Sequence, residues 1–415
     1  MPVPARNTLA IIGAGPIGLE AAVAALDAGF DVHVFERGEV AAHQHAWGHV
    51  RMFTPWRMDV GPSARAHLER SGWIMPDAET CPTGRELAAE YLEPLAALPE
   101  LKDRVHPYAQ VVQVSRHALL KGDEIGTGRR GAQPFRLLVR DHGGRENFIQ
   151  AFHLIDASGV YGSPNWAGDG GIPARQELYL APQMSYHVDD VRDLRRERYA
   201  GKRTLVIGSG ASAATTVSEL AALADEAPDT AVTWVTRGAA ETLYPLQPGD
   251  PLPARHALIE RARALLRGES AVVAHVGGAV VDGFEYNSAT HRYRVRLMIG
   301  EAARLEEADH VIVNTGFGPD ETLYRELQVH TCWATLAPMK LSTALLAAGG
   351  ADCMTTPVFG ADPLANPEPG FFILGHKSYG RRGDFLLATG YHQVADVIAH
   401  MARGLAEPVS GGARA

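Results

Sequence analysis

Two glycine-rich stretches are the parts of this sequence whose residue types and spacing most clearly indicate chemistry. Each follows an apolar stretch of strand character, opens a stretch of helical character, and precedes a second strand that ends about 20 residues later. Glycines in such a turn let the backbone approach a pyrophosphate, which the positive end of the helix attracts. We therefore predict two dinucleotide sites, at Gly13-Ala14-Gly15-Pro16-Ile17-Gly18 and at Gly208-Ser209-Gly210-Ala211-Ser212-Ala213.

The first stretch predicts a site for FAD or NAD. A strand over residues 9–12 leads into the turn, a helix runs to about residue 28, and a second strand over residues 31–35 ends at Glu36. A carboxylate there can accept hydrogen bonds from both hydroxyls of an adenosine ribose, and it disfavours a 2′-phosphate. We assign Glu36 and the adjacent Arg37 to the cofactor site. The alternative is a tight turn that binds no ligand.

The second stretch predicts a site for NADPH. Strands over residues 204–207 and 231–235 flank a helix, and the second strand ends at Thr236-Arg237 without an acidic residue. A guanidinium can pair with a 2′-phosphate through two hydrogen bonds, which favours NADPH over NADH. Ala213 replaces the third glycine, and a methyl group still permits close packing of helix on strand. The alternative for Arg237 is an ordinary solvated arginine.

The composition is that of an ordinary globular protein. The chain has 415 residues, 46% of them hydrophobic, and a net charge of −9, which suits two or three domains. Because no dense basic run occurs, neither nucleic acid nor an anionic membrane surface is expected as a partner. No stretch has the pattern of a signal peptide or a membrane span, so we expect a cytoplasmic protein. A homo-oligomer is compatible with these features.

The three cysteines are Cys81, Cys332 and Cys353. Their spacing excludes a zinc ribbon and a close-spaced redox pair, although Cys332 and Cys353 could still meet in space. The other interpretation is three reduced and mostly buried thiols, as is usual in the cytosol.

Further elements are predicted between the two turns. Apolar spacing predicts a helix over residues 84–98, which Pro94 should end or kink. Alternating segments at residues 109–114, 135–140 and 147–154 predict a small β-meander. Buried strands then end in small-residue turns that contain Gly159 and Gly316.

In motif order the chain resembles the class B flavin-dependent monooxygenases, within the flavoproteins that have two dinucleotide-binding domains. The resemblance rests on the first turn with Glu36, on residues 82–92 and 156–165, on residues 201–203 before the second turn, and on residues 314–320. His187 takes the place of the family's fingerprint histidine, but the flanking glycine and aromatic pattern is missing. The resemblance implies an α/β fold with two Rossmann-like domains, the NADPH domain being inserted into a discontinuous FAD domain.

From this resemblance we expect an FAD domain at residues 1–170 and 330–405, and an NADPH domain at residues 171–329. Residues 406–415 have the composition of a disordered tail. Residues 331–370 match no standard motif, and a loop over the flavin cleft would carry substrate selectivity.

The segment over residues 371–393 predicts a strand, a turn at Gly375 and a helix that begins near Asp384 as its N-cap. In similar flavoproteins the positive end of such a helix faces the flavin pyrimidine oxygen. On this basis we assign Gly375, Phe385 and Leu386 to the FAD site, together with Gly159 and Gly316 at the domain crossings. The alternative is a strand, loop and helix that only close the fold.

The chain departs from the family after Glu36, where residues 43–57 are rich in His, Trp and Arg. Trp47 and Gly48 take the family's flavin-facing positions, which would place His49 and Arg51 near the ring. A zinc site built from His43, His45 and His49 is the weaker interpretation, because no acidic or cysteine ligand adjoins them, so we predict no metal.

The resemblance implies an enzyme that reduces FAD with NADPH and forms a C4a-(hydro)peroxyflavin with O₂. One oxygen atom would then pass to a small molecule at nitrogen or sulfur. We name His49, Arg51 and Lys340 as catalytic candidates, and the basic residues Arg51, Lys340 and Arg382 suggest an anionic or amino-acid-like substrate. Two alternatives are a reductase or dehydrogenase that inserts no oxygen, and a catalytically silent nucleotide sensor.

Overall fold

Two compact units form the structure, a computed structural model that describes residues 3–246, 249–349, 354, 357 and 359–406. The first unit holds the described residues of 1–48, 54–163 and 318–415, and the second holds those of 49–53 and 164–317. Each unit combines one parallel sheet with one three-stranded antiparallel sheet.

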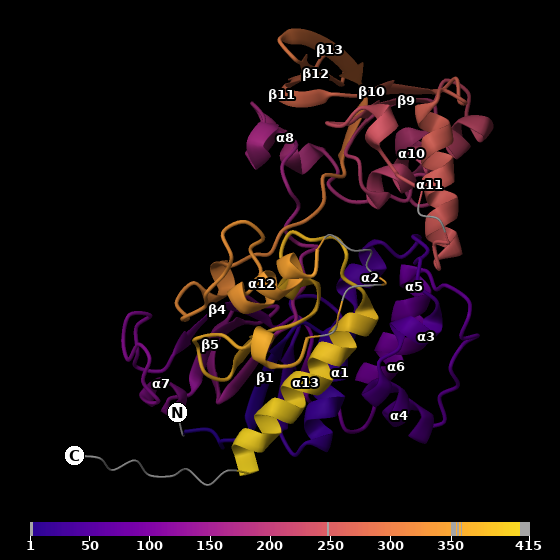
Figure 1. Ribbon diagram of the computed structural model, residues 1–415. Helices are drawn as coiled ribbons and strands as arrows, with labels where there is room; N and C mark the ends of the chain where they lie inside the picture. Colours follow the sequence, from indigo (N-terminus) through magenta and orange to yellow (C-terminus); the bar gives the residue numbers. More distant parts are fainter. Residues whose placement is uncertain (1–2, 247–248, 350–353, 355–356, 358, 407–415) are drawn as a thin grey trace. The chain divides into compact units, whose positions relative to one another are not determined.

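The first unit contains both ends of the described chain (Figure 1). Its strands are β1 (Thr8–Ile12), β2 (Asp31–Phe35), β3 (Val105–His106), β4 (Gln110–Arg116), β5 (Phe135–Arg140), β6 (Glu146–Ala151), β7 (His153–Asp156) and β15 (Phe371–Ile373). Its α-helices are α1 (Pro16–Asp27), α2 (Ala42–Ala46), α3 (Trp56–Asp59), α4 (Pro62–Arg70), α5 (Gly84–Leu87), α6 (Glu93–Ala96), α7 (Arg129–Ala132), α12 (Met339–Ala347) and α13 (Leu387–Ala406). Shorter turns of other helix types are η1 (Ala88–Leu92), η5 (Thr322–Tyr324), η6 (Asp362–Leu364) and η7 (Gly375–Tyr379).

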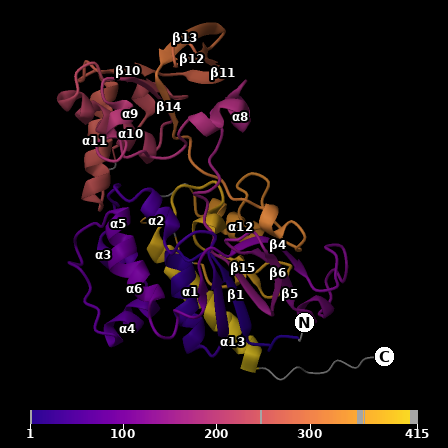
Figure 2. The same cartoon turned by 180° about the vertical axis from the view of Figure 1, so that it is seen from behind.

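A five-stranded parallel sheet is the centre of the first unit, in the order β15-β7-β1-β2-β3. One face packs its apolar residues against the antiparallel sheet β4-β5-β6, where Ile12 and Leu154 join one core with Leu137. Helices α1 and α13 lie side by side in both views (Figures 1 and 2). Because α1 is rich in alanine, α13 can approach it closely.

The second unit repeats this plan. Its strands are β8 (Arg203–Ile207), β9 (Ala231–Val235), β10 (Val273–Val276), β11 (Ala279–Asn287), β12 (Arg292–Ile299), β13 (Ala302–Ala308) and β14 (His310–Val313). Its helices are η2 (Asp169–Gly171), α8 (Glu177–Leu180), η3 (Ala181–Gln183), α9 (Arg196–Tyr199), α10 (Ala211–Glu226), η4 (Ala240–Thr242) and α11 (Pro253–Leu266).

Its parallel sheet has the order β10-β9-β8-β14, and its antiparallel sheet has the order β11-β12-β13. Alternate residues of β8 face opposite cores, as the two-residue period of a strand requires. Leu205 and Ile207 pack with residues of β11 to β13, whereas Val206 packs with residues of α10 and α11. Both faces of this sheet are therefore covered.

The predicted α/β class with two Rossmann-like units is confirmed, and three details of the prediction are corrected. The helix expected over residues 84–98 consists of α5, the π-turn η1 and α6, with Pro94 in the first turn of α6, where a missing N–H costs least. The third meander strand ends at Ala151, and residues 153–156 instead form β7 of the parallel sheet. Helix α13 begins at Leu387 rather than near Asp384.

The later start of α13 has a physical reason. The carboxylate of Asp384 accepts two hydrogen bonds from the Arg382 guanidinium, at 2.9 Å from Nε and 2.5 Å from Nη2. A bidentate, charge-assisted pair of this kind competes successfully with capping of a helix.

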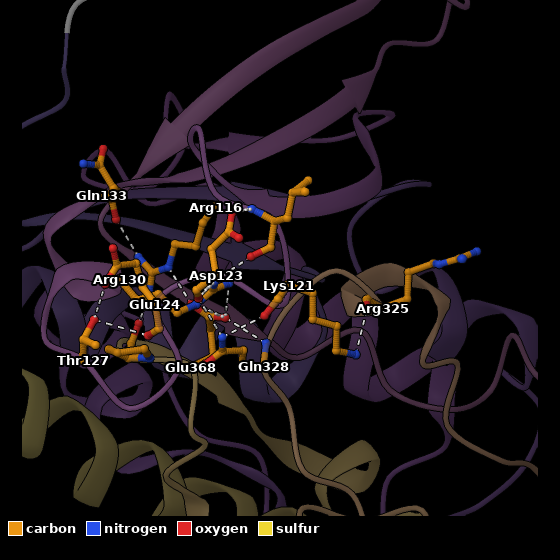
Figure 3. Close-up of polar contacts among 12 residues, drawn as sticks. Arg116, Lys121, Asp123, Glu124, Thr127, Arg130, Gln133, Arg325, Gln328 and Glu368 are labelled. Atoms are coloured by element: carbon orange, nitrogen blue, oxygen red, sulfur yellow. Dashed lines mark hydrogen bonds and ion pairs between the residues drawn. The ribbon is translucent and has the colours of Figure 1, made fainter.

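A buried ionic cluster anchors the chain where it returns to the first unit (Figure 3). The carboxylate of Glu368 accepts hydrogen bonds from Arg116 Nε at 2.7 Å, from Arg130 Nη2 at 2.9 Å and from the Gln328 amide at 2.8 Å. Burial by itself would raise the pKa of Glu368, but the bonds from Arg130 and Arg116 lower it below its usual value. The cluster thus joins β4, α7 and the returning segment.

No described helix is long and apolar enough to span a membrane. The predicted tail over residues 406–415 lies outside the described residues except for Ala406, and Cys353 also lies outside them. The described cysteines Cys81 and Cys332 form no disulfide.

Candidate dinucleotide sites

The first glycine turn connects β1 to α1 and depends on two close contacts. Gly13 has a φ of +104°, and a Cβ there would lie 2.6 Å from the carbonyl oxygen of Ala157. A Cβ on Gly18 would lie only 1.9 Å from the carbonyl oxygen of Gly13. At Gly15, in contrast, a Cβ would meet no atom within 4 Å, so this face of the turn is open to the close approach of a ligand.

Glu36 follows β2 and lies beside this turn, as predicted. Its Oε2 accepts a hydrogen bond from the Ala14 amide at 2.9 Å, and its Oε1 accepts one from the Gly38 amide at 2.8 Å. Each carboxylate oxygen has a second lone pair that can accept a bond from a ribose hydroxyl. The adjacent Arg37 is exposed, and its Nη2 would lie 3.2 Å from a Cβ on Gly162.

Two further turns flank the first glycine turn. Gly159, with a φ of +70°, follows β7, and Gly375, with a φ of +75°, follows β15. A Cβ on Gly375 would lie 3.2 Å from the side chain of Ile17 in α1. Phe385 stacks on His376 with ring centroids 5.6 Å apart, and the Leu386 carbonyl accepts a hydrogen bond from the Gly390 amide in α13. The structure thus gathers Gly13, Ile17 and Gly375, all predicted site residues.

The second glycine turn connects β8 to α10 with the same geometry. Gly208 has a φ of +141°, and a Cβ there would lie 2.1 Å from the Asn314 carbonyl oxygen. A Cβ on Gly210 would meet no atom within 4 Å. Ser209, Gly210 and Ala211 are exposed, and Ser212 is half-buried. This turn therefore also presents an open face.

The end of β9 gives the second turn its charge. Thr236 is buried, and its hydroxyl donates to the Gly238 carbonyl at 2.7 Å and lies 2.8 Å from His275 Nε2. Arg237 is exposed and has no ion-pair or hydrogen-bond partner among the described residues. Its guanidinium is available to an anion, and neither Thr236 nor Arg237 carries a negative charge.

His187 and Gly316 belong to the surroundings of the second turn. Asn314 donates from Nδ2 to the His187 carbonyl at 3.1 Å and accepts a bond from Thr216 at 2.8 Å. The His187 ring stacks on Phe317 with centroids 5.5 Å apart, and burial lowers the pKa of His187. Gly316 has a φ of +85°. His187 is therefore connected to the glycine turn through Asn314.

The histidine-rich segment divides between the two units. Trp47 packs against α5, because a Cβ on Gly84 would lie 2.4 Å from its ring. His45 Nε2 lies 2.8 Å from Glu93 Oε1, and the His43 ring lies 5.3 Å from that of Tyr161. Residues 49–53, which include His49 and Arg51, group instead with the second unit. The structure therefore does not place His49 and Arg51 in one unit with Trp47.

The three predicted basic residues lie on different segments of the chain. Lys340, in α12, is 56% exposed and pairs with Asp362 at 3.1 Å, while Arg382 pairs with Asp384. Arg51 belongs to the segment that groups with the second unit. Lys340 and Arg382 thus each have a carboxylate partner, and their contact with an anionic substrate stays a prediction.

Two buried carboxyl groups of the first unit were missed from the sequence. Asp156 ends β7, has no exposed surface and pairs with Lys377. The one signal in the sequence was an acidic residue directly after the apolar Leu154-Ile155. Asp59 is also fully buried, its Oδ1 accepts a bond from Thr54 at 2.6 Å, and its Oδ2 has no partner among the described residues. Burial raises the pKa of Asp59 to about 7.

Comparison with known proteins agrees with this geometry. Residues 10–129 match the family model for pyridine nucleotide-disulphide oxidoreductases. No protein matched in a comparison with curated sequences.

Three solved structures share the fold over nearly their whole length. A bacillithiol disulfide reductase from Bacillus cereus is 18% identical, with 96% of this chain and 99% of that chain covered and a TM-score of 0.69. An ornithine N-hydroxylase from Kutzneria sp. 744 is 18% identical, with coverages of 97% and 100% and a TM-score of 0.63. A thioredoxin reductase from T. acidophilum is 14% identical, with coverages of 96% and 98% and a TM-score of 0.59. The chain therefore has the fold of the flavoproteins with two dinucleotide-binding domains.

Proposed function

We propose that the first unit binds FAD and the second binds NADPH, so that the chain is a flavin-dependent oxidoreductase. The proposal rests on the two glycine turns and on the different residues that follow the neighbouring strands β2 and β9. The first turn has the carboxylate of Glu36 beside it, which suits an unmodified ribose. The second has Thr236 and the unpaired, exposed guanidinium of Arg237, which suits a 2′-phosphate.

The residues present fit the two cofactors. Gly15 and Gly210 are the positions where an added Cβ would meet no protein atom, and each precedes the first turn of a helix. A pyrophosphate at either place would receive backbone N–H groups and the positive end of the helix. The structures of the ornithine N-hydroxylase, described with reduced FAD and NADP⁺, and of an FAD-bound cadaverine monooxygenase support the assignment by their shared fold.

The reaction we propose is insertion of one oxygen atom from O₂ into a small molecule, at nitrogen or sulfur. Bound FAD would accept two electrons from NADPH, and its reduced ring would then react with O₂. The chain would hold the two nucleotides by their pyrophosphates and distinguish their riboses through Glu36 and Arg237. The ornithine and cadaverine hydroxylases with this fold support nitrogen as the atom oxidised.

The experiment measures NADPH oxidation, O₂ consumption, peroxide release and ¹⁸O-labelled product in the same reaction. Protein reconstituted with FAD is supplied with NADPH and ¹⁸O₂, with and without ornithine or cadaverine as probe amines. We expect NADPH oxidation to consume O₂, and a productive amine to lower peroxide release while ¹⁸O enters the product. Protein that binds no FAD overturns the whole proposal. NADPH oxidation that yields peroxide with every small amine, and no labelled product, overturns oxygen insertion.

A second candidate is a reductase that passes electrons from NADPH to a disulfide or to another acceptor, without inserting oxygen. The bacillithiol and thioredoxin reductases with this fold support it, as does one cysteine. Hydrogen bonds from Ser342 and Thr335 lower the pKa of Cys332 to about 7, which favours its thiolate. Reduction of a disulfide probe by NADPH under anaerobic conditions, lost in Cys332→Ser, would favour this candidate over monooxygenation.

A further inference from the structure

Asp156 has an unusual position in the first unit. It ends β7, the second strand of the parallel sheet, and pairs in register with Ile12 on one side and Ile373 on the other. Its carboxylate has no exposed surface. The only cation at this carboxylate among the described residues is Lys377, whose Nζ lies 2.7 Å from Oδ2 and whose side chain is 2% exposed. The pair is therefore shielded from water.

Ser158 completes the cluster. Its amide and its hydroxyl both donate to Asp156 Oδ1, at 3.0 Å and 2.6 Å. Lys377 Nζ also donates to the Ser158 hydroxyl at 3.2 Å and lies 5.1 Å from the ring centroid of Tyr324. The carboxylate thus accepts three hydrogen bonds, and the ammonium is held by two oxygens and an aromatic face.

The fold itself does not require this ion pair. In the second unit, Val313 ends β14 and pairs with Ile207 as Asp156 pairs with Ile12. The two strands take the same place beside their glycine turns, because the Asn314 and Ala157 amides donate to Ile207 and Ile12 respectively. A buried ion pair is also no more stabilising than apolar residues of similar volume. The charged pair in the first unit therefore needs an explanation other than stability.

The cluster connects the two turns that flank the first glycine turn. On one side, a Cβ on Gly13 would lie 3.1 Å from the Ser158 Cα. On the other side, Gly375 packs on Ile17 and begins η7, which contains Lys377. The bonds from Lys377 to Asp156 and Ser158 therefore connect the turn after β7 to the turn after β15, in addition to the pairing of the two strands.

We propose that Lys377 is a positioning residue of the FAD site and acts through Asp156 and Ser158. It holds the turns that contain Gly159 and Gly375 in the arrangement that the dinucleotide requires. This inference rests on the proposed binding of FAD to the first unit.

The test separates positioning from stability with the double variant Asp156→Val, Lys377→Met. It replaces the ion pair by apolar side chains, with a valine at the place that Val313 takes in the second unit, so we expect the FAD-free double variant to unfold at a temperature closer to wild type than Lys377→Met does. Titration with FAD, followed by quenching of flavin fluorescence, should show a Kd raised roughly tenfold or more. The single variant Lys377→Met should unfold at lower temperature, because it leaves Asp156 buried without its cation.

Ser158→Ala provides a second, milder measurement that does not depend on the double variant folding. It removes one acceptor of Lys377 and one donor to Asp156, and we expect an FAD Kd raised roughly two- to fivefold. Arg104→Met is the matched control, because its ion pair with Asp31 at 2.6 Å lies at the start of β2, away from the turn. Its FAD affinity should equal that of wild type.

The outcomes distinguish this inference from the proposed function. Wild-type protein that binds no FAD overturns the proposed function. Wild-type protein that binds FAD, together with a folded double variant or a Ser158→Ala variant of unchanged FAD affinity, overturns only the role of Lys377. Weaker FAD binding in both variants at near-unchanged stability supports it.

Discussion

The two glycine turns share one backbone geometry. Gly15 has φ and ψ of −90° and −171°, and Gly210 has −90° and −178°. The Gly13 amide donates to the Phe35 carbonyl at 2.8 Å, and the Gly208 amide donates to the Val235 carbonyl at 3.0 Å. The strand, turn and helix are therefore specified twice in this chain by the same local rules.

The surroundings of the turns differ. Gly13, Ala14 and Pro16 are buried, whereas Ser209, Gly210 and Ala211 are exposed. Gly18 packs directly on the backbone of the first turn, where a Cβ would not fit. At the equivalent position of the second turn, the structure accommodates the methyl group of Ala213. The first strand end offers a carboxylate and the second a guanidinium. An enclosed turn suits a cofactor that stays bound during turnover, and an exposed turn suits one that must leave, as proposed for FAD and NADPH.

The largest expected effect is that of Gly18→Ala. The added Cβ would lie 1.9 Å from the Gly13 carbonyl oxygen, a backbone atom that cannot move without opening the turn. We expect a loss of about 3 kcal/mol or more in the free energy of unfolding and no measurable FAD binding. Urea denaturation and FAD titration measure the two effects.

The reciprocal change in the second turn is Ala213→Gly. It should cost only about 1 kcal/mol, the difference in helix propensity, and leave NADPH affinity nearly unchanged. Equal effects of the two substitutions would contradict the difference in packing between the turns.

The next largest effect is that of Glu36→Ala. The variant loses the acceptor of the Ala14 and Gly38 amides as well as the proposed ribose contact. We expect the FAD Kd to rise about ten- to a hundredfold, the scale of one or two charge-assisted hydrogen bonds. Glu36→Gln keeps one acceptor oxygen, so its FAD Kd should lie between those of Glu36→Ala and wild type. An unchanged Kd in Glu36→Ala would show that the strand end does not contact the nucleotide.

A smaller effect is expected for Arg237→Ala. Loss of one charge-assisted contact should reduce the preference for NADPH over NADH roughly tenfold, measured as the ratio of kcat/KM values for the two. Arg261→Ala is the control, because Arg261 is an exposed arginine of the same unit with no described partner. If both variants keep the wild-type ratio, the 2′-phosphate is recognised elsewhere.

Local patterns allowed the turns, their strands and Glu36 to be predicted from the sequence. The spacing of glycines and apolar residues fixes those elements within one chain segment. Lys377 and Asp156 could not be paired this way, because their contact joins η7 to the end of β7, which are 221 residues apart in the sequence. The partners of Lys340 and Arg382 could not be predicted either, because an ion pair with Asp362 or Asp384 leaves no periodic pattern in the sequence.

A further expected effect concerns the buried acids, which also differ between the units. In the second unit Glu177 is fully buried and accepts bonds from the Ala167 and Ala174 amides and from Tyr186. In the first unit Asp59 is equally buried but accepts a side-chain bond from Thr54 alone, and its Oδ2 has no described partner. Both carboxylate oxygens of Glu177 therefore accept hydrogen bonds, whereas only Oδ1 of Asp59 does so.

This difference gives Asp59 a pH dependence with a defined sign. Burial raises its pKa from the usual 3.8 to about 7, so between these values the unfolded chain is ionised while the folded protein keeps its proton. Stability must then fall as the pH rises from about 4 to about 7, at up to about 1.4 kcal/mol per pH unit. Neighbouring Tyr91, Tyr391 and Glu20 act on the same site, and Glu20, whose pKa burial also raises, adds in the same direction. Urea denaturation at pH 5 and pH 8 should show that Asp59→Asn retains about 2 kcal/mol of the stability that wild type loses over this interval. A wild-type pH dependence shared in full by Asp59→Asn would mean that the carboxyl of Asp59 is ionised in the folded protein and has found a partner for its second oxygen.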